Sequence, residues 1–87
     1  MVMHAAALYD AGEPCGIEAN AAKLLAADAA VEATEAAQIT FGGFGYAKGY
    51  HVERLVREAL LFRIVPVTPQ MLLSFIAEKA LELPKSY

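Results

Sequence analysis

The chain has 87 residues, of which 57% are hydrophobic and 20% are charged, and its formal net charge is −3. A domain of this size buries only about 60–65% of its unfolded surface, so we expect part of its apolar surface to meet another subunit or further parts of a longer chain. Lys and Arg do not cluster on one face, which argues against nucleic acids and anionic membranes as partners.

The sequence carries no sign of export or membrane insertion. No stretch approaches the roughly 18–20 uninterrupted apolar residues that cross a bilayer, and the first four residues lack the pattern of a signal peptide. The single cysteine, Cys15, has no partner for an internal disulfide. We therefore expect a cytoplasmic protein with a reduced thiol and no membrane span.

The sequence predicts an all-α fold. Helix-forming residues dominate, and strand-favouring residues gather only at 63–67, where Pro66 interrupts them. Because a helical pattern begins at residue 1 without a cap, we expect the chain to be a fragment. Four helices are expected, with approximate bounds 1–10, 14–40 (or 17–40), 52–62 and 68–84.

Specific residues mark the ends of these helices. Gly12 and Pro14 should form the turn between the first and second helices. The last helix should begin at Thr68, whose hydroxyl would cap it and which is followed by Pro69 at the first helical position. Pro84 should end it.

Two helical faces carry a clear pattern. The third helix should have an apolar face, formed by Val52, Leu55, Val56, Ala59 and Leu60 at helical spacing. The second helix carries an acidic stripe, formed by Asp28, Glu32 and Glu35. Because neither His nor Cys joins this stripe, we favour a solvated face over a cation site and expect no metal.

Glycines and aromatic residues alternate after the second helix, from Gly42 to Tyr46. This loop does not match the dinucleotide fingerprint, since Lys48 stands where its last glycine belongs and the loop follows a helix instead of a strand. Two interpretations stay open: a simple helix cap and turn, or free amides that accept a phosphate or an adenine edge. Tyr46 and Tyr50 would either stack on a ligand or fill the space beside the glycines. For Arg54 and Arg57 we favour ion pairs, within the chain or between subunits, over binding of a substrate.

Five segments occur in an order and spacing that resemble the C-terminal helical domain of the FAD-dependent acyl-CoA dehydrogenase family. They are YDAGEP (residues 9–14), AAKLLAADAAVEATEAAQI (21–39), FGGFGY (41–46), VERLVREA (52–59) and the closing ELPKSY. The resemblance covers residues 5–87. It implies a partial C-terminal all-α domain that lacks the N-terminal α and middle β domains.

The resemblance also implies contacts with FAD. In this family, the Gly-Gly loop of one subunit reaches the adenosine diphosphate half of the FAD bound by its neighbour. Gly42 and Gly43 match that loop, and Thr68 and Gln70 match a Thr-x-Gln that also touches the nucleotide. Gln38 lies one residue out of register with the family's glutamine, a shift that rotates a helical side chain by about 100°.

No catalytic residue is expected in this chain. Many family members carry a Glu before the last helix that removes the α-proton of the substrate, and here Pro66 occupies that position. The base would then come from an earlier helix, outside these residues, or the protein would catalyse another reaction.

The resemblance implies α,β-dehydrogenation of acyl-CoA thioesters in fatty acid metabolism, with FAD as hydride acceptor and an electron-transfer flavoprotein as electron acceptor. It also implies a homodimer or homotetramer. We expect the 87 residues alone to be inactive and to self-associate. The alternative is a stand-alone helical interaction or oligomerisation module without flavin chemistry.

Overall fold

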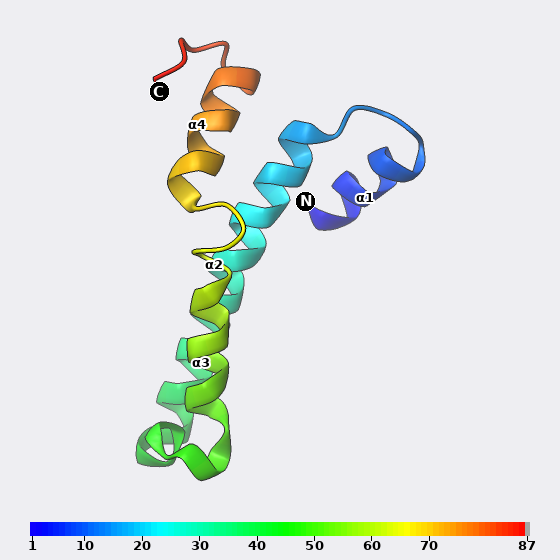
Figure 1. Ribbon diagram of the computed structural model, residues 1–87. Helices are drawn as coiled ribbons and strands as arrows, with labels where there is room; N and C mark the ends of the chain where they lie inside the picture. The colour runs from blue at the N-terminus through cyan, green and yellow to red at the C-terminus, as the bar shows by residue number, and fades with distance from the viewer. Residues whose placement is uncertain (87) are drawn as a thin grey trace. The chain divides into compact units, whose positions relative to one another are not determined.

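The computed structural model describes residues 1–86 (Figure 1). Over these residues the chain forms α-helices, short 3-10 helices and turns, without a strand, so the prediction of an all-α fold is confirmed. The chain divides into two compact units, one made of Met1–Ala26 and the residues from Val67 onward, and the other of Ala27–Pro66. We call them unit 1 and unit 2.

Helix α1 (Val2–Asp10) opens unit 1, and its end has a clear physical cause. Gly12 adopts φ = +72°, a left-handed conformation that costs glycine little. The N–H of Gly12 donates to the carbonyl of Tyr9 at 3.0 Å, and that of Glu13 donates to Leu8 at 2.9 Å. This is the Schellman pattern of helix termination, and it confirms the predicted turn.

Helix α4 (Pro69–Ala80) begins where the sequence predicts, with Pro69 in its first turn. The Thr68 hydroxyl, however, makes no capping hydrogen bond, contrary to our expectation. The helix also ends before Pro84. Glu82 takes a left-handed φ of +54°, and the N–H of Leu83 turns back to donate to the carbonyl of Ala77.

The core of unit 1 lies between α4 and the start of α2 (Gly16–Phe41). Leu72 on α4 is 2% exposed and is the largest fully buried side chain among the described residues. A Cβ atom added to Gly16 would lie 3.7 Å from the ring of Phe75, so the two helices touch there. Helix α1 buries none of its residues.

Unit 2 contains the second part of α2, two 3-10 helices, η1 (Gly42–Tyr46) and η2 (Lys48–Tyr50), and helix α3 (Val52–Leu61). An ion pair of 2.7 Å joins Asp28 on α2 to Arg63 just after α3. A hydrogen bond joins Gln38, near the other end of this part of α2, to Gly45 in the loop. These two links mean that α2 and α3 run antiparallel.

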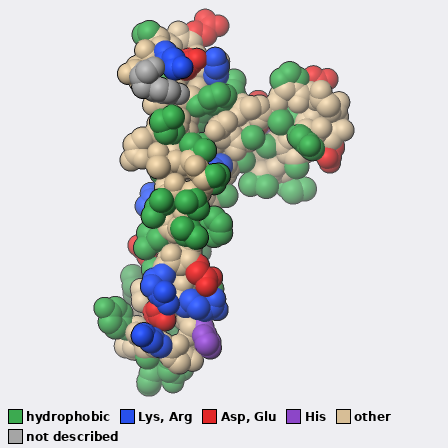
Figure 2. Space-filling view, in the orientation of Figure 1, with side chains coloured by type: hydrophobic (Ala, Val, Ile, Leu, Met, Phe, Trp, Pro, Cys, Tyr) green, Lys and Arg blue, Asp and Glu red, His purple; other side chains and the backbone are tan. Residues whose placement is uncertain are grey.

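The predicted apolar face of α3 is only partly buried. Val52 and Ala59 are buried together with Ala27 and Val31 of α2, whereas Leu55 and Leu60 are exposed. Figure 2 shows hydrophobic side chains on the surface of both units. Both units therefore expose apolar surface, which is where the further contacts expected from the composition would form.

The acidic stripe does not gather into a metal site. Asp28 pairs with Arg63, and Glu32 and Glu35 are exposed. Residues 1–86 contain no group of three His, Cys, Asp or Glu side chains able to hold a metal ion. Across the same residues, no helix combines the length and the apolar character that a membrane span requires.

Candidate functional site

The glycine loop begins where α2 ends, and its glycines have different environments. Gly42 adopts φ = +61°, which turns the chain out of the helix. A Cβ atom added to either Gly42 or Gly43 would meet nothing within 4 Å. The predicted contact residues are thus exposed to approach from outside. Gly45 is the reverse case: it is buried, and an added Cβ would collide with the backbone carbonyl of Gln38.

Gln38 has a role inside the chain that sequence reasoning missed. Its side-chain Nε2 donates a hydrogen bond of 3.2 Å to the carbonyl oxygen of Gly45. Together with the close approach of Gly45 to the backbone at position 38, this bond fixes the loop against the end of α2. The sequence shows only a glutamine seven residues before a glycine, a pattern that does not predict this bond.

The aromatic residues of the loop divide into a packed group and a free side chain. The ring of Tyr50 lies 5.1 Å from Phe44 and 6.3 Å from Phe41, the latter edge to face, a favourable aromatic arrangement. Tyr46 is 84% exposed. Of the two open interpretations, packing therefore applies to Tyr50, while Tyr46 stays available to a ligand.

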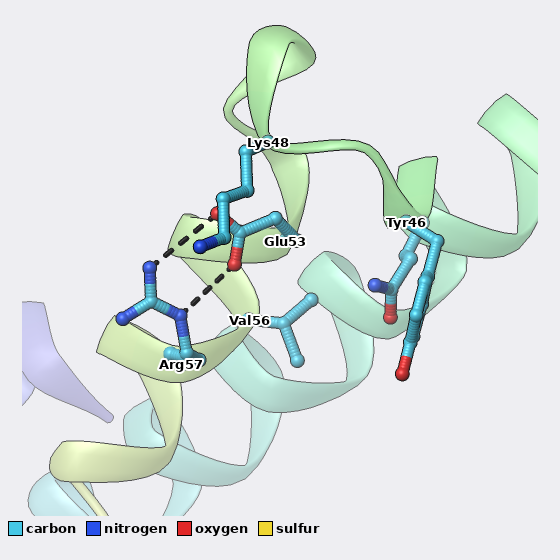
Figure 3. Close-up of a pocket in the computed structure, with 6 residues that line it drawn as sticks. Tyr46, Lys48, Glu53, Val56 and Arg57 are labelled. Carbon is cyan, nitrogen blue, oxygen red and sulfur yellow. Dashed lines mark hydrogen bonds and ion pairs between the residues drawn. The ribbon is translucent and has the colours of Figure 1, made fainter. Parts of the chain in front are cut away.

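A pocket of about 410 Å³ lies in unit 2 (Figure 3). Figure 3 shows Lys48, Glu53 and Arg57 on one side of it, the ring of Tyr46 on the other, and Val56 between them. The loop and α3 supply these five residues, and α2 adds Gln38.

His51, at the junction of η2 and α3, does not line the pocket. Its backbone has φ = +63°, an uncommon value for a residue other than glycine.

The ion pair in this pocket is well defined. Arg57 Nε donates to Glu53 Oε2 at 2.9 Å, and Nη2 donates to Oε1 at 3.4 Å. The hydrogen bond lowers the pKa of the Glu53 carboxyl below its ordinary value of 4.5 and raises the pKa of the Arg57 guanidinium. The Glu53 side chain is 17% exposed and that of Arg57 is 68% exposed. The Glu53 carboxylate is therefore shielded from solvent, whereas the Arg57 guanidinium faces outward.

A second ion pair on α3 lies outside the pocket lining. Arg54 Nη1 is 2.6 Å from Glu58 Oε1, again with a spacing of four residues. The sequence expectation that Arg54 and Arg57 form ion pairs is confirmed for both.

The other predicted residues lie in two places. Thr68 and Gln70 belong to unit 1, at the start of α4, where Thr68 is half-buried and Gln70 is exposed. Pro66 is exposed and follows Val65 through a cis peptide bond. Residues 63–68 contain no carboxylate, so this segment offers no base. The predicted contacts with FAD thus fall in two groups, one in each unit.

Comparison with known proteins identifies the relatives of this chain. The family description "Acyl-CoA dehydrogenase, C-terminal domain" matches residues 1–81. The acyl-CoA dehydrogenase FadE12 of Mycobacterium tuberculosis is 42% identical over 89 aligned residues, which cover 100% of this chain and 23% of the relative. An acyl-CoA dehydrogenase of Bacillus subtilis is 46% identical over 71 residues, covering 82% of this chain and 19% of the relative.

A third relative is the cyclohexane-1-carbonyl-CoA dehydrogenase of Geobacter metallireducens, 40% identical over 82 residues, covering 94% of this chain and 22% of the relative. No solved structure matches the chain significantly. The chain thus spans about a quarter or less of the length of these relatives. On the match over residues 1–81, the chain belongs to the acyl-CoA dehydrogenase family, in which it corresponds to the C-terminal domain.

Proposed function

We propose that this chain is part of an FAD-dependent acyl-CoA dehydrogenase and that its loop contacts the nucleotide half of an FAD bound by a neighbouring subunit. Membership of the family supports this proposal. The observation that carries it is the open space around Gly42 and Gly43, where no side chain or backbone would meet an added Cβ within 4 Å. Another molecule can therefore approach these peptide groups closely.

The residues present fit such a ligand. The Gln38 and Gly45 contact keeps the turn in place while Gly42 and Gly43 stay exposed. At the start of α4, Thr68 and Gln70 would also contact an FAD nucleotide, because the first amides of a helix and its positive dipole end favour a pyrophosphate.

FAD, when bound, would accept the hydride in the α,β-dehydrogenation of an acyl-CoA thioester, and an electron-transfer flavoprotein would take up the electrons. The chain's own contribution is to bind and orient the nucleotide. The α-proton must leave to a base elsewhere, because Pro66 occupies the position that supplies the base in many members. The protein would function as a homodimer or homotetramer, since one subunit's loop serves its neighbour's cofactor.

The contact is tested by adding bulk where the chain itself has room. Gly43 has open space and no left-handed φ, so Gly43→Val should leave the fold intact. Gly49→Val is the matched control, since Gly49 has the same open surroundings. We expect FAD to raise the melting temperature of the 87-residue chain and of Gly49→Val, because a ligand that binds the folded state stabilises it. The melting temperature of Gly43→Val should not respond to FAD.

The absence of any FAD effect on the unsubstituted chain would favour the stand-alone interaction module. A second assay concerns catalysis. With acyl-CoA thioesters of increasing chain length, from butyryl-CoA through octanoyl-CoA, as substrates and a dye as electron acceptor, these 87 residues should show no turnover. Robust turnover would contradict the proposal that further parts of the enzyme are required.

A further inference from the structure

Gln38 is joined to the glycine loop at two points. Its side-chain Nε2 donates a hydrogen bond of 3.2 Å to the carbonyl oxygen of Gly45. Its backbone carbonyl lies so close to Gly45 that an added Cβ atom would collide with it. Both contacts connect the C-terminal part of α2 to the far side of the loop, so the segment 39–44 is held at each of its ends.

This segment contains the two open glycines. An added Cβ at Gly42 or Gly43 would meet nothing within 4 Å. Glycine has more backbone freedom than any other residue, and a mobile loop must give up that freedom when it binds a ligand. Because the contacts at Gly45 close the segment into a short loop, they restrict Gly42 and Gly43 before a ligand arrives.

Gln38 and its neighbour Ile39 have different surroundings. Successive side chains of a helix differ in direction by about 100°. Gln38 is half-buried, whereas Ile39 is 80% exposed. When the chain is aligned with the family on the two glycines, Ile39 stands where the family has its glutamine. The exposed position therefore carries an apolar side chain, and the glutamine amide bonds to the loop.

We infer that Gln38 is a positioning residue. Through Gly45 it holds the peptide groups of Gly42 and Gly43 in the arrangement that a ligand meets, and it does not contact that ligand itself. The inference rests on the proposed function for the identity of the ligand, which is FAD. The ordering of the free loop does not depend on the ligand and can be measured without it.

The test compares the 87-residue chain with Gln38→Met, which keeps the length of the side chain and removes its N–H donor. In the ligand-free variant, NMR order parameters of the amides in segment 42–44 should fall from about 0.85 to below about 0.6. They should rise again at saturation with FAD. The affinity for FAD, measured by calorimetry, should fall about three- to tenfold, the usual effect of one lost hydrogen bond.

Thr40→Val is the matched control. The Thr40 hydroxyl also donates a hydrogen bond from the end of α2, at 2.8 Å, but its acceptor is the carbonyl of Ala36 in the same helix and not the loop. This variant should leave the order parameters of the loop and the affinity for FAD unchanged. Equal effects of Thr40→Val and Gln38→Met would overturn the inference, since both would then report on the end of the helix alone.

Two further results would overturn it. If Gln38→Met weakens FAD binding while the free loop stays ordered, the side chain contacts the ligand directly. If hydrogen exchange of the α3 amides accelerates as much as that of the loop amides, the bond supports unit 2 as a whole and does not position the glycines.

Failure of the proposed function gives a different pattern. If FAD has no effect on the unsubstituted chain, the proposed contact with FAD fails, and the ligand-free order parameters decide the role of Gln38. Loosening confined to segment 42–44 in Gln38→Met then supports the inference, and an unchanged loop overturns it.

Discussion

Gly43 and Gly45 are two residues apart and tolerate opposite changes. A side chain at Gly43 would extend into open space, whereas one at Gly45 would meet the carbonyl of Gln38 and the Cβ of Phe41. The third glycine of the loop is therefore structural, and the first two are available to a partner. Substitutions at these positions can separate loss of folding from loss of binding.

We predict that Gly45→Ala destabilises unit 2 by about 1–3 kcal/mol, the usual cost of forcing extra atoms into a packed site. The measurement is urea unfolding followed by circular dichroism. Gly49→Ala serves as the control, since its new methyl group has space. If both variants unfold at the same urea concentration as the unsubstituted chain, Gly45 does not pack closely against the carbonyl of Gln38.

Acid should weaken α3. The hydrogen bond from Arg57 lowers the pKa of Glu53 in the folded chain below its ordinary value of 4.5. A carboxyl whose folded pKa is lowered contributes stability above its unfolded pKa and loses that contribution as the pH falls through the folded value. The contribution of Glu53 should therefore fade below about pH 4.5. Glu78, whose pKa is lowered by Lys79, should behave in the same way on α4.

Carboxyl NMR titration checks this prediction directly. In Arg57→Gln, the midpoint of Glu53 should rise towards 4.5, while the midpoint of Glu78 should stay where it is. An unchanged Glu53 midpoint in that variant would contradict the ion pair.

At the scale of single elements, the packing of α4 depends on one of two adjacent leucines. Leu72 is 2% exposed and Leu73 is 54% exposed. We predict that Leu72→Ala costs about 2–5 kcal/mol and that Leu73→Ala, on the surface, changes stability by less than about 0.5 kcal/mol. Thermal unfolding of the two variants measures the difference. Similar losses would mean that α4 packs in another rotation.

The sequence predicts where most of the helices lie, but it does not predict the contacts between the helices. Gly12 marks the end of α1 because its left-handed conformation is a local property. The end of α4 was placed too late, since the turn at Glu82 depends on a bond from Leu83 back to Ala77 that no local pattern reveals. The sequence also does not predict the hydrogen bond from Gln38 to Gly45, which depends on the loop folding back on α2, or the pocket, which depends on α2, the loop and α3 coming together.

At the scale of the whole molecule, the buried core is small. Large apolar side chains such as Met3 and Ile39 are mostly exposed, and the fully buried large side chain in residues 1–86 is Leu72. The buried apolar residues among those described are Ala22, Ala27, Val31, Val52, Ala59 and Leu72. Apolar surface of this extent is typical of an interface and not of an isolated monomer.

We predict that the 87-residue chain self-associates, because association removes exposed apolar surface from water. Analytical ultracentrifugation over a range of concentrations measures the mass. A monomer at every concentration would contradict this prediction and would leave the exposed surface unexplained.

The division of the chain into units has a consequence for the order in which its parts fold. Residues 27–66 are contiguous, whereas the other unit joins the first 26 residues to those beyond 66. Contacts close in sequence form sooner than distant ones, so the hairpin of α2 and α3 should acquire its structure before α4 packs against the first part of α2. Pulsed hydrogen exchange during refolding should accordingly protect the amides of α3 before those of α4.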